Sequence, residues 1–310
     1  MTDSLIPVVV IVGPTASGKT ALAVECALRF NGEIVSADSM QIYKGMSIAT
    51  AKPTFDEMKG VPHHLIDCVE PDKIFSVANY VNEAKKVIFD INSRDKLPII
   101  TGGTGLYVDS LINNVKFTET PTDFDLRKNL QQRMIDTGAE NMLSELAKFD
   151  EKTAEKLHPN NTKRIIRAFE VYILTGKTMS QLEAESKSEP SPFSPVFIGI
   201  NYRDRKVLYD RINLRVDLMM QNGLLEEAKK YHSLKHGTAV QAIGYKELGP
   251  YFKGELPLQT CIDNLKQATR NYAKRQLTWF RKNDKINWFF PDDYDNTALF
   301  CEAVYKIAER

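Results

Sequence analysis

Short apolar runs alternate with helical periodicity over the first third of the chain. Residues 6–12, 33–37 and 96–101 are short segments centred on valine and isoleucine, the pattern of buried strands. Between the last two, residues 77–94 place apolar side chains at the three- and four-residue spacing of an amphipathic helix. Strands that alternate with helices in this way predict a parallel α/β sheet with flanking helices.

From about residue 120 to residue 189 the strand pattern disappears and helical periodicity replaces it. Helices are predicted over 125–136, 139–149, 152–157 and 163–175. Strand patterns return at 196–200 and 286–290, with helices predicted at 205–221, 224–234, 245–251 and 258–282. We therefore predict a core domain, residues 1–118 and 196–310, that is interrupted by an all-helical insertion domain, residues 119–195.

The first predicted strand leads into a phosphate-binding loop. Its residues are Gly13, Pro14, Thr15, Ala16, Ser17, Gly18, Lys19 and Thr20, which match the spacing G-x-x-x-x-G-K-[ST]. Glycines let backbone N–H groups wrap a phosphate, the next helix points its positive N-terminus at it, and the lysine reaches the outer phosphates. The Thr20 hydroxyl is then expected to ligate Mg²⁺. The predicted fold class is α/β, similar to the phosphate-loop NTPases.

Polar segments follow the next two predicted strands. Asp38-Ser39-Met40-Gln41 follows the second strand, and Gly102-Gly103-Thr104-Gly105 follows the third. Ligands of parallel sheets bind at the carboxyl ends of the strands, so these segments and the phosphate loop are expected to converge. Asp38 fits either a general base or magnesium partner, or a turn cap. Thr104 fits a helix N-cap that also donates a hydrogen bond to a ligand.

The third strand ends in Thr101 and a glycine turn, whereas many phosphate-loop NTPases place a magnesium-binding aspartate there. A pyrophosphate leaving group supplies the two linked phosphates without any nucleoside. The residues alone therefore leave three alternatives: a small-molecule or nucleotide kinase, a nucleic-acid-binding ATPase, and a transferase that releases pyrophosphate.

Composition does not decide among these three functions, but it limits the kind of protein. The 310 residues are 43% hydrophobic and carry a net charge of +1. No apolar run approaches the ~20 residues of a membrane span, so a soluble cytoplasmic protein with no membrane partner is expected. The four cysteines, Cys26, Cys68, Cys261 and Cys301, lie far apart and are expected to be reduced and buried. His232 and His236 are one helical turn apart, but a solvent-exposed pair is the favoured interpretation over a metal site.

Residues 270–285 carry a local excess of positive charge, although the whole chain is nearly neutral. The segment holds six lysines and arginines against one aspartate, with Tyr272, Trp279 and Phe280 between them. Such a helix can meet nucleic-acid phosphates with its cations and bases with its rings. An amphipathic surface helix with its aromatic side chains in the core fits the pattern equally well.

Motifs along nearly the whole chain resemble the bacterial tRNA dimethylallyltransferase family. They are the phosphate loop, residues 38–43, 50–53, 62–67, 102–107, His158-Pro159-Asn160-Asn161 with Arg164 and Arg167, residues 241–246 and residues 272–281. Ser47 and Ala49 depart from the family pattern, which usually has Asp and Gly there. His63 and His64 lie within one family-like segment, where a packing or capping role is at least as compatible as a catalytic one.

The resemblance implies transfer of a dimethylallyl group from dimethylallyl diphosphate to N6 of the adenine 3′ of the tRNA anticodon, with release of pyrophosphate. It implies Asp38 as general base, Thr104 beside the adenine and the diphosphate, Arg211 and Arg215 at the diphosphate, and Mg²⁺ as cofactor. A cytoplasmic monomer that binds the anticodon stem-loop is expected. The implied tRNA contacts are Asp38, Ser39, Met40, Gln41, Thr104, Arg127, Lys163, Arg164, Ile165, Ile166, Arg167, Gln241, Gly244, Tyr245, Lys246, Lys274, Arg275 and Arg281.

Overall fold

The computed structural model describes residues 5–117, 123–186, 189–232, 239 and 242–309. The chain divides into two compact units: unit 1 contains Met1–Ile112 and Ser191–Arg310, and unit 2 contains Asn113–Pro190. Both boundaries of unit 2 lie a few residues before the corresponding boundaries of the predicted insertion 119–195. The difference at the second boundary arises because strand β5 begins at Phe193, where it pairs with Ile6 of the first strand.

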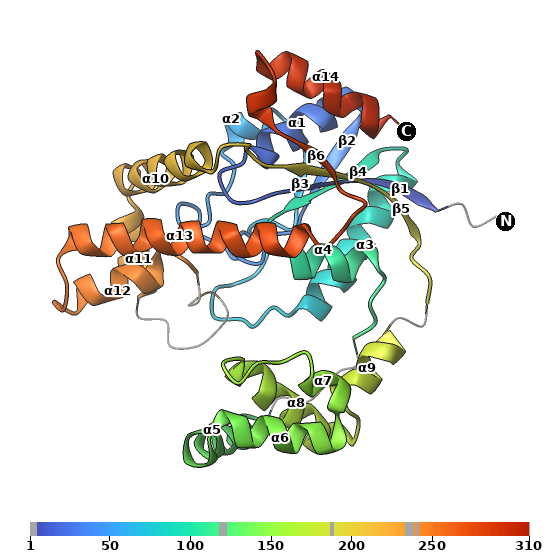
Figure 1. Ribbon diagram of the computed structural model, residues 1–310. Coiled ribbons are helices and arrows are strands. Elements are labelled where there is room, and N and C mark those ends of the chain that lie inside the picture. Colours follow the sequence, from blue (N-terminus) through green and yellow to red (C-terminus); the bar gives the residue numbers. More distant parts are fainter. Residues whose placement is uncertain (1–4, 118–122, 187–188, 233–238, 240–241, 310) are drawn as a thin grey trace. The chain divides into compact units, whose positions relative to one another are not determined.

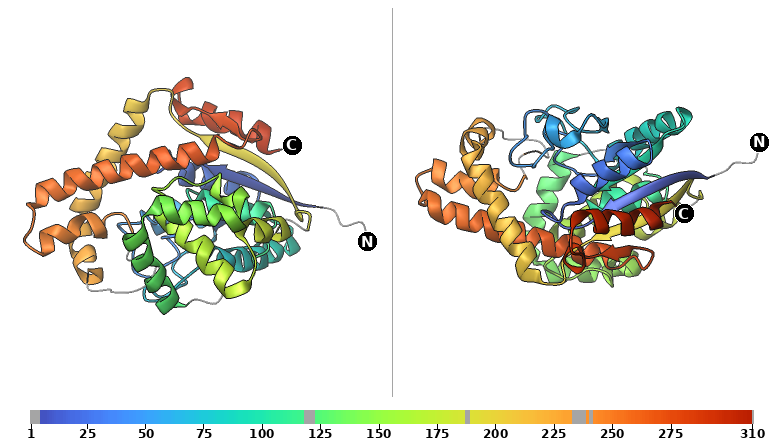
Figure 2. Two further views of the ribbon diagram at one scale, coloured as in Figure 1. Left: turned by 60° about the horizontal axis from the view of Figure 1, so that its bottom comes forward. Right: turned by 90° about the horizontal axis from the view of Figure 1, so that it is seen from above.

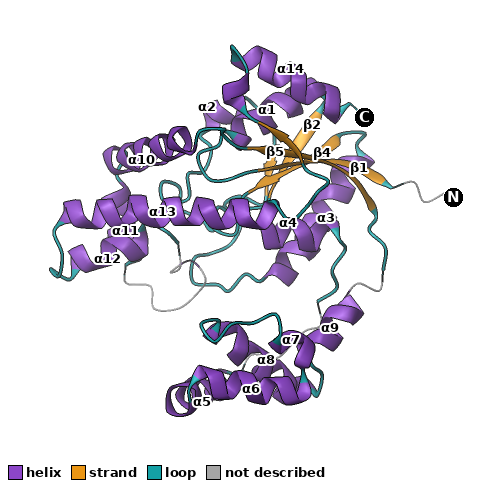
Figure 3. Ribbon diagram, viewed as in Figure 1, coloured by secondary structure: helices purple, strands orange, loops and turns teal. Residues whose placement is uncertain are grey.

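Unit 1 is built on a parallel sheet. Its strands are β1 (Ile6–Val12), β2 (Gly32–Ser36), β3 (His63–His64), β4 (Leu97–Gly102), β5 (Phe193–Ile200) and β6 (Asn287–Phe289). They lie in the order β3-β2-β4-β1-β5-β6, and every described pairing is parallel. Figure 3 shows the strands in orange and labels β1, β2, β4 and β5. β1 is therefore central, with both neighbours buried against it, which explains its unbroken apolar sequence.

Helices cover both faces of this sheet (Figure 1). One face of β1, including Val8, Val10 and Val12, packs with α3 (Val77–Ser93) and α4 (Gly105–Ile112). The other face, including Val9 and Ile11, packs with α1 (Lys19–Arg29) and α14 (Thr297–Ala308). The alternation of side chains along a strand thus divides the apolar residues of β1 between two cores.

A group of helices follows β5 and extends unit 1 beyond the sheet. The group contains α10 (Arg205–Gln221), α11 (Leu224–Tyr231), α12 (Tyr245–Phe252) and α13 (Leu258–Phe280). The long helix α13 packs against α10, α12 and α4, so it links this group to the sheet (Figure 2). Between β2 and α3 lies a loop region with the short helix α2 (Phe55–Met58), and the turn η2 (Pro291–Asp293) precedes α14.

Unit 2 is helical throughout the part that the structure describes. Its helices are α5 (Phe124–Thr137), α6 (Ala139–Phe149), α7 (Glu151–Ala154), α8 (Thr162–Thr175) and α9 (Met179–Ser186). Leu130, Leu146 and Phe169 are among the buried side chains of a separate apolar core. No described helix of either unit is long and apolar enough to cross a membrane.

Candidate active site

The polar segments after β1, β2 and β4 come together because these strands are neighbours in the sheet. β4 pairs with β1 on one side and with β2 on the other. Hydrogen bonds then join the segments beyond the strands: the backbone N–H of Thr104 donates to the Ala37 carbonyl at 3.1 Å, and that of Ser39 donates to Thr104 Oγ1 at 3.0 Å. The predicted convergence at the carboxyl ends of the strands is thus confirmed.

The phosphate loop has a tightly packed backbone. A Cβ atom at Gly13 would lie 2.5 Å from the carbonyl oxygen of Ile200, so only glycine fits where the loop leaves β1. Gly18 has φ +94°, a left-handed conformation that glycine adopts without strain, immediately before α1. Ala16 is also left-handed, at φ 63°, and is held by packing against Leu208 and Ile212 of α10. The loop is therefore preformed.

Two arginines of α10 lie against this loop. Arg211 Nε donates to the Ala16 carbonyl at 2.9 Å, and Arg215 Nη1 donates to Thr15 Oγ1 at 3.3 Å. They join Lys19, whose ammonium group lies 3.3 Å from the Pro14 carbonyl. Three cations thus gather around a loop of backbone N–H groups, which is an arrangement suited to a multiply charged anion.

This crowding of charge changes the protonation of Lys19. Burial lowers the pKa of Lys19 to about 8, the positive charge of Arg215 contributes to the decrease, and the carboxylate of Asp38 opposes it. Burial, followed by the charge of Arg211, also lowers the pKa of Arg215 from its usual value. An anion with several negative charges would relieve this repulsion.

Asp38 and Thr104 lie on the other side of the site. Asp38 Oδ1 accepts hydrogen bonds from the backbone N–H groups of Met40 at 2.9 Å and Gln41 at 3.3 Å, so the turn-cap interpretation holds for this oxygen. The Thr104 hydroxyl, which accepts the Ser39 backbone N–H, donates to Ser39 Oγ at 3.3 Å. The carboxylate and the hydroxyl are therefore fixed by one short loop.

Helix α13 supplies two side chains to this region that sequence reasoning did not select as site residues. Gln276 Oε1 accepts the Thr15 backbone N–H at 2.8 Å, and its Nε2 donates to the Gly103 carbonyl at 3.0 Å. The phenol of Tyr272 lies in the same region, where burial and the charge of Asp38 raise its pKa. The sequence signal for Gln276 is its place on the buried face of α13, where a long polar side chain stands among mostly apolar residues. That face is formed by residues 261, 265, 269, 273, 276 and 280.

The glycine turn after β4 is explained by its neighbours. A Cβ at Gly102 would lie 2.2 Å from the Ala37 carbonyl oxygen, and one at Gly103 would lie 2.0 Å from Gln276 Nε2. A Cβ at Gly105 would lie 2.2 Å from the Trp279 ring. Three of the four turn residues are therefore glycines because Ala37, which follows β2, and α13 approach the backbone closely at these positions.

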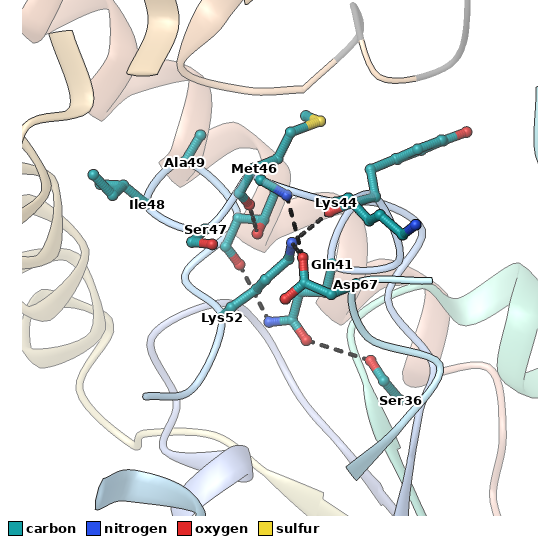
Figure 4. A network of polar contacts seen from close by, with 12 residues as sticks. Ser36, Gln41, Lys44, Met46, Ser47, Ile48, Ala49, Lys52 and Asp67 are labelled. Atoms are coloured by element: carbon teal, nitrogen blue, oxygen red, sulfur yellow. Dashed lines mark hydrogen bonds and ion pairs between the residues drawn. The ribbon is translucent and has the colours of Figure 1, made fainter. Parts of the chain in front are cut away.

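A network beside Asp38 holds the loop that follows β2 (Figure 4). Gln41 Nε2 donates to the carbonyls of Thr50 and Ala51, both at 3.2 Å, and Gln41 Oε1 accepts from Ser36 Oγ at 3.3 Å. The ammonium of Lys52, 4% exposed, binds the Tyr43 carbonyl and the Asp67 carboxylate. The Gln41 side chain, predicted to contact tRNA, is thus engaged within the protein.

Glu227 of α11 fixes the same loop from the opposite side. Its carboxylate accepts three consecutive backbone N–H groups, those of Ser47, Ile48 and Ala49, each at 2.9 Å. The phenol of Tyr245 also donates to it at 2.9 Å. Tyr245 is 6% exposed, and Gly244 is buried, so neither of these residues, both predicted to bind tRNA, presents an exposed group in this structure. Lys246 is exposed.

Unit 2 corrects the predicted interface at several residues. Ile165 and Ile166 are buried in its apolar core at 0% and 8% exposure, because they occupy the inward face of α8. Arg127 and Arg167 are half-exposed, and each donates at 2.8 Å to the fully buried carboxylate of Glu170. Their hydrogen bonds help to hold the pKa of Glu170 below its usual value. Lys163 and Arg164 are exposed.

The basic segment 270–285 combines both interpretations of its sequence. Phe280 is buried at 2% exposure, and Trp279 Nε1 donates to Asp109 at 2.7 Å, so both rings face the protein. Lys274, Arg275 and Arg281 are exposed. One face of α13 therefore packs while the other presents cations.

Other predicted features have structural roles. His64 Nε2 contacts Glu33 Oε2, and His63 Nδ1 contacts the Val61 carbonyl, both at 2.8 Å, consistent with packing.

No group of three or more His, Cys, Asp or Glu residues in the described part of the chain could hold a metal. Cys68 is exposed, contrary to the expectation for all four cysteines, while the other three are buried. Gln241 and His236 lie outside the described residues.

The fold and the loop together define an α/β protein of the phosphate-loop class. A model of the IPP transferase family matches residues 41–283. Proteins named tRNA dimethylallyltransferase from Thermoanaerobacter sp. (strain X514) and Bacillus subtilis (strain 168) are 50% and 49% identical, covering 97% and 93% of this chain and 97% and 92% of theirs. This chain therefore belongs to the IPP transferase family.

Solved structures agree with this family assignment. The tRNA isopentenylpyrophosphate transferase of Bacillus halodurans superimposes with a TM-score of 0.73 at 43% identity, covering 99% of this chain and 97% of that one. A eukaryotic dimethylallyltransferase described as acting on tRNA gives a TM-score of 0.80 at 31% identity, covering 97% of this chain and 79% of that one. Both comparisons extend over nearly the whole of this chain, so the similarity is not restricted to the phosphate loop.

Proposed function

We propose that this protein transfers a dimethylallyl group from dimethylallyl diphosphate to N6 of the adenine 3′ of the anticodon in tRNA. The observation that carries the proposal is the junction of the cationic phosphate loop with the Asp38–Thr104 pair at adjacent strand ends. One part of the site can hold a departing diphosphate, and the neighbouring part offers a carboxylate to an acceptor amine. The names of the relatives support the same reaction.

In the proposed reaction the bond between dimethylallyl C1 and the diphosphate oxygen breaks as the N6–C1 bond forms. The electron pair of the broken bond passes to the diphosphate, where Lys19, Arg211, Arg215 and the loop N–H groups stabilise the charge. The proton leaving N6 goes to Asp38, whose position is fixed by the N–H groups of Met40 and Gln41. Thr104, held in place by hydrogen bonds with Ser39, would orient the acceptor amine and the diphosphate.

We propose that Mg²⁺ assists this reaction. The donor set fits an ion held mainly by its substrate, because Mg²⁺ is usually bound by one or two protein oxygens together with phosphates and water. The Thr20 hydroxyl, in the first turn of α1, is the proposed protein ligand. When bound, the ion supplies positive charge to the leaving diphosphate.

Each unit by itself offers exposed cations to the proposed tRNA substrate. Among the predicted contacts these are Lys246, Lys274, Arg275 and Arg281 in unit 1, and Lys163 and Arg164 in unit 2. Asp38, Ser39, Met40 and Thr104 would surround an adenine that has left its stack. We further propose that the protein acts as a monomer in the cytoplasm, a location compatible with a tRNA substrate.

Nucleoside analysis tests the proposal directly. The protein is incubated with unmodified tRNA, dimethylallyl diphosphate and Mg²⁺, and the digested tRNA is analysed by mass spectrometry. A prenylated adenosine is expected, and ATP in place of dimethylallyl diphosphate should yield no product. Absence of prenylated adenosine with folded protein, or phosphoryl transfer from ATP to a small molecule, would support the kinase alternative instead.

The low pKa of Lys19 predicts a pH-dependent affinity for dimethylallyl diphosphate. Below pH 8 the free protein already carries the ammonium group, whereas above it binding requires proton uptake. Because the bound diphosphate raises this pKa, the Kd should increase by up to about tenfold per pH unit above 8. Calorimetry without tRNA, from pH 7 to 9.5, measures this change. K19M is the control, and an equally steep profile in that variant would contradict the assignment.

The exposed cations Lys274 of α13 and Arg281, directly after its end, predict a salt-dependent affinity for tRNA. Replacing Lys274 and Arg281 by alanine should weaken binding and reduce the slope of log K against log salt by about one for each phosphate that the variant no longer neutralises. Filter binding over a salt series measures the slope. Lys86→Ala is the control, since Lys86 is an exposed lysine of α3 that pairs with Glu83. A slope unchanged in the double variant would exclude α13 from the interface.

A further inference from the structure

Gln276 connects the two parts of the proposed site. Its amide spans from the phosphate loop, through the Thr15 N–H, to the turn that carries Thr104, through the Gly103 carbonyl. Both hydrogen bonds are short, at 2.8 and 3.0 Å, and Gln276 is 4% exposed. A buried amide with both ends bonded resists rearrangement, because displacement would leave two backbone groups unpaired.

The amide of Gln276 fills the space beside Gly103. A side chain at Gly103 would clash with this amide, and its Cβ would lie 3.8 Å from the Lys19 ammonium. The bridge is therefore next to the cation that is proposed to hold the diphosphate. The Thr15 N–H is paired with Gln276, and the Ser17 N–H donates to the Pro14 carbonyl at 3.3 Å, so these two loop N–H groups already have partners within the protein.

Helix α13 is itself fixed against the segment that bears Thr104. Trp279 Nε1 donates to Asp109 of α4 at 2.7 Å, and a Cβ at Gly105 would lie 2.2 Å from the Trp279 ring. The phosphate loop and Thr104 consequently take their separation from α13, in addition to the strands β1 and β4.

We propose that Gln276 is a positioning residue that fixes the separation between the leaving diphosphate and the acceptor nitrogen. This rests on the proposed function, since the two groups belong to that reaction. In-line transfer requires the reacting atoms to approach within about 3–3.5 Å, and a misplacement of about 1 Å can cost about 10²-fold in rate. Removal of the bridge should therefore reduce kcat more than it reduces binding of either substrate.

Two variants test this inference. Q276L removes both hydrogen bonds, whereas Q276E keeps an acceptor for the Thr15 N–H and loses the donor to Gly103 unless it is protonated. In Q276L we expect kcat to fall about 10- to 100-fold, while Kd values for tRNA and pyrophosphate stay within about threefold. In Q276E we expect the same kcat defect at high pH and partial recovery as the pH falls, because a protonated carboxyl can again donate to the Gly103 carbonyl.

T269V is the matched control. Thr269 is another buried polar residue on the same face of α13, and its hydroxyl donates to the Leu265 carbonyl within the helix at 2.8 Å. This variant should keep wild-type kcat. An unchanged kcat in Q276L, or equal losses of kcat and tRNA affinity, would overturn the positioning role. If Q276L does not fold, a Q276E pH profile that matches wild type would overturn it. Wild-type protein that forms no prenylated adenosine would instead refute the proposed function.

Discussion

Replacing Asp38 by asparagine is expected to lower kcat by about 10²- to 10⁴-fold, the usual contribution of a positioned general base. The amide oxygen of the introduced asparagine can still accept the N–H groups of Met40 and Gln41, so the loop should keep its shape. The amide cannot accept the proton of the attacking amine. Single-turnover prenylation under saturating substrates measures the chemical step.

A comparison of two variants separates proton transfer from loop structure. D38N should retain tRNA affinity within about twofold, whereas D38A also loses the turn hydrogen bonds and should bind tRNA less well. Prenylation by D38N at the wild-type rate would exclude Asp38 as the base. The pair is informative because Asp38 caps the turn in the structure and is also the proposed base.

Replacing Lys19 by methionine is expected to lower kcat by about 10²- to 10³-fold, as removal of a charge-stabilising donor does in other transfer reactions. Methionine fills similar space but provides no charge to the diphosphate as the C1–oxygen bond breaks. The affinity for tRNA should not change. Steady-state kinetics with varied dimethylallyl diphosphate, together with tRNA binding, distinguish these effects.

Lys86→Met is the control for this experiment, because Lys86 lies on α3 with its side chain 72% exposed. It should leave kcat and both substrate affinities at wild-type values. If K19M instead retained kcat and lost tRNA affinity, Lys19 would belong to the nucleic-acid interface, and the phosphate loop would need another ligand.

Much of the fold follows from periodicity. The predicted strand 6–12 and the helices 139–149 and 205–221 coincide with β1, α6 and α10. The phosphate loop, Asp38 and Thr104 were found because each follows directly after a strand. Such features depend on neighbours in sequence and on the direction of parallel strands, both of which can be read from one chain.

The remainder depends on interactions between distant segments. Strand β3 has two residues and exists through its pairing with β2, so no periodic signal marks it. Helix α14 was not predicted, although Asn296 caps its first turn. The pairing of Arg127 and Arg167 with Glu170 joins α5 and α8, and basic composition alone could not distinguish this buried pairing from a nucleic-acid surface.

The bridge made by Gln276 also concerns the order in which the protein is synthesised. The N–H of Thr15 and its acceptor are 261 residues apart in the chain, so the phosphate loop is made long before α13. Contacts of such long range form late, because the intervening chain must be ordered first. A nascent chain that lacks α13 would carry a phosphate loop in which the Thr15 N–H has no Gln276 to accept it. The complete loop would therefore form only after α13 has been synthesised.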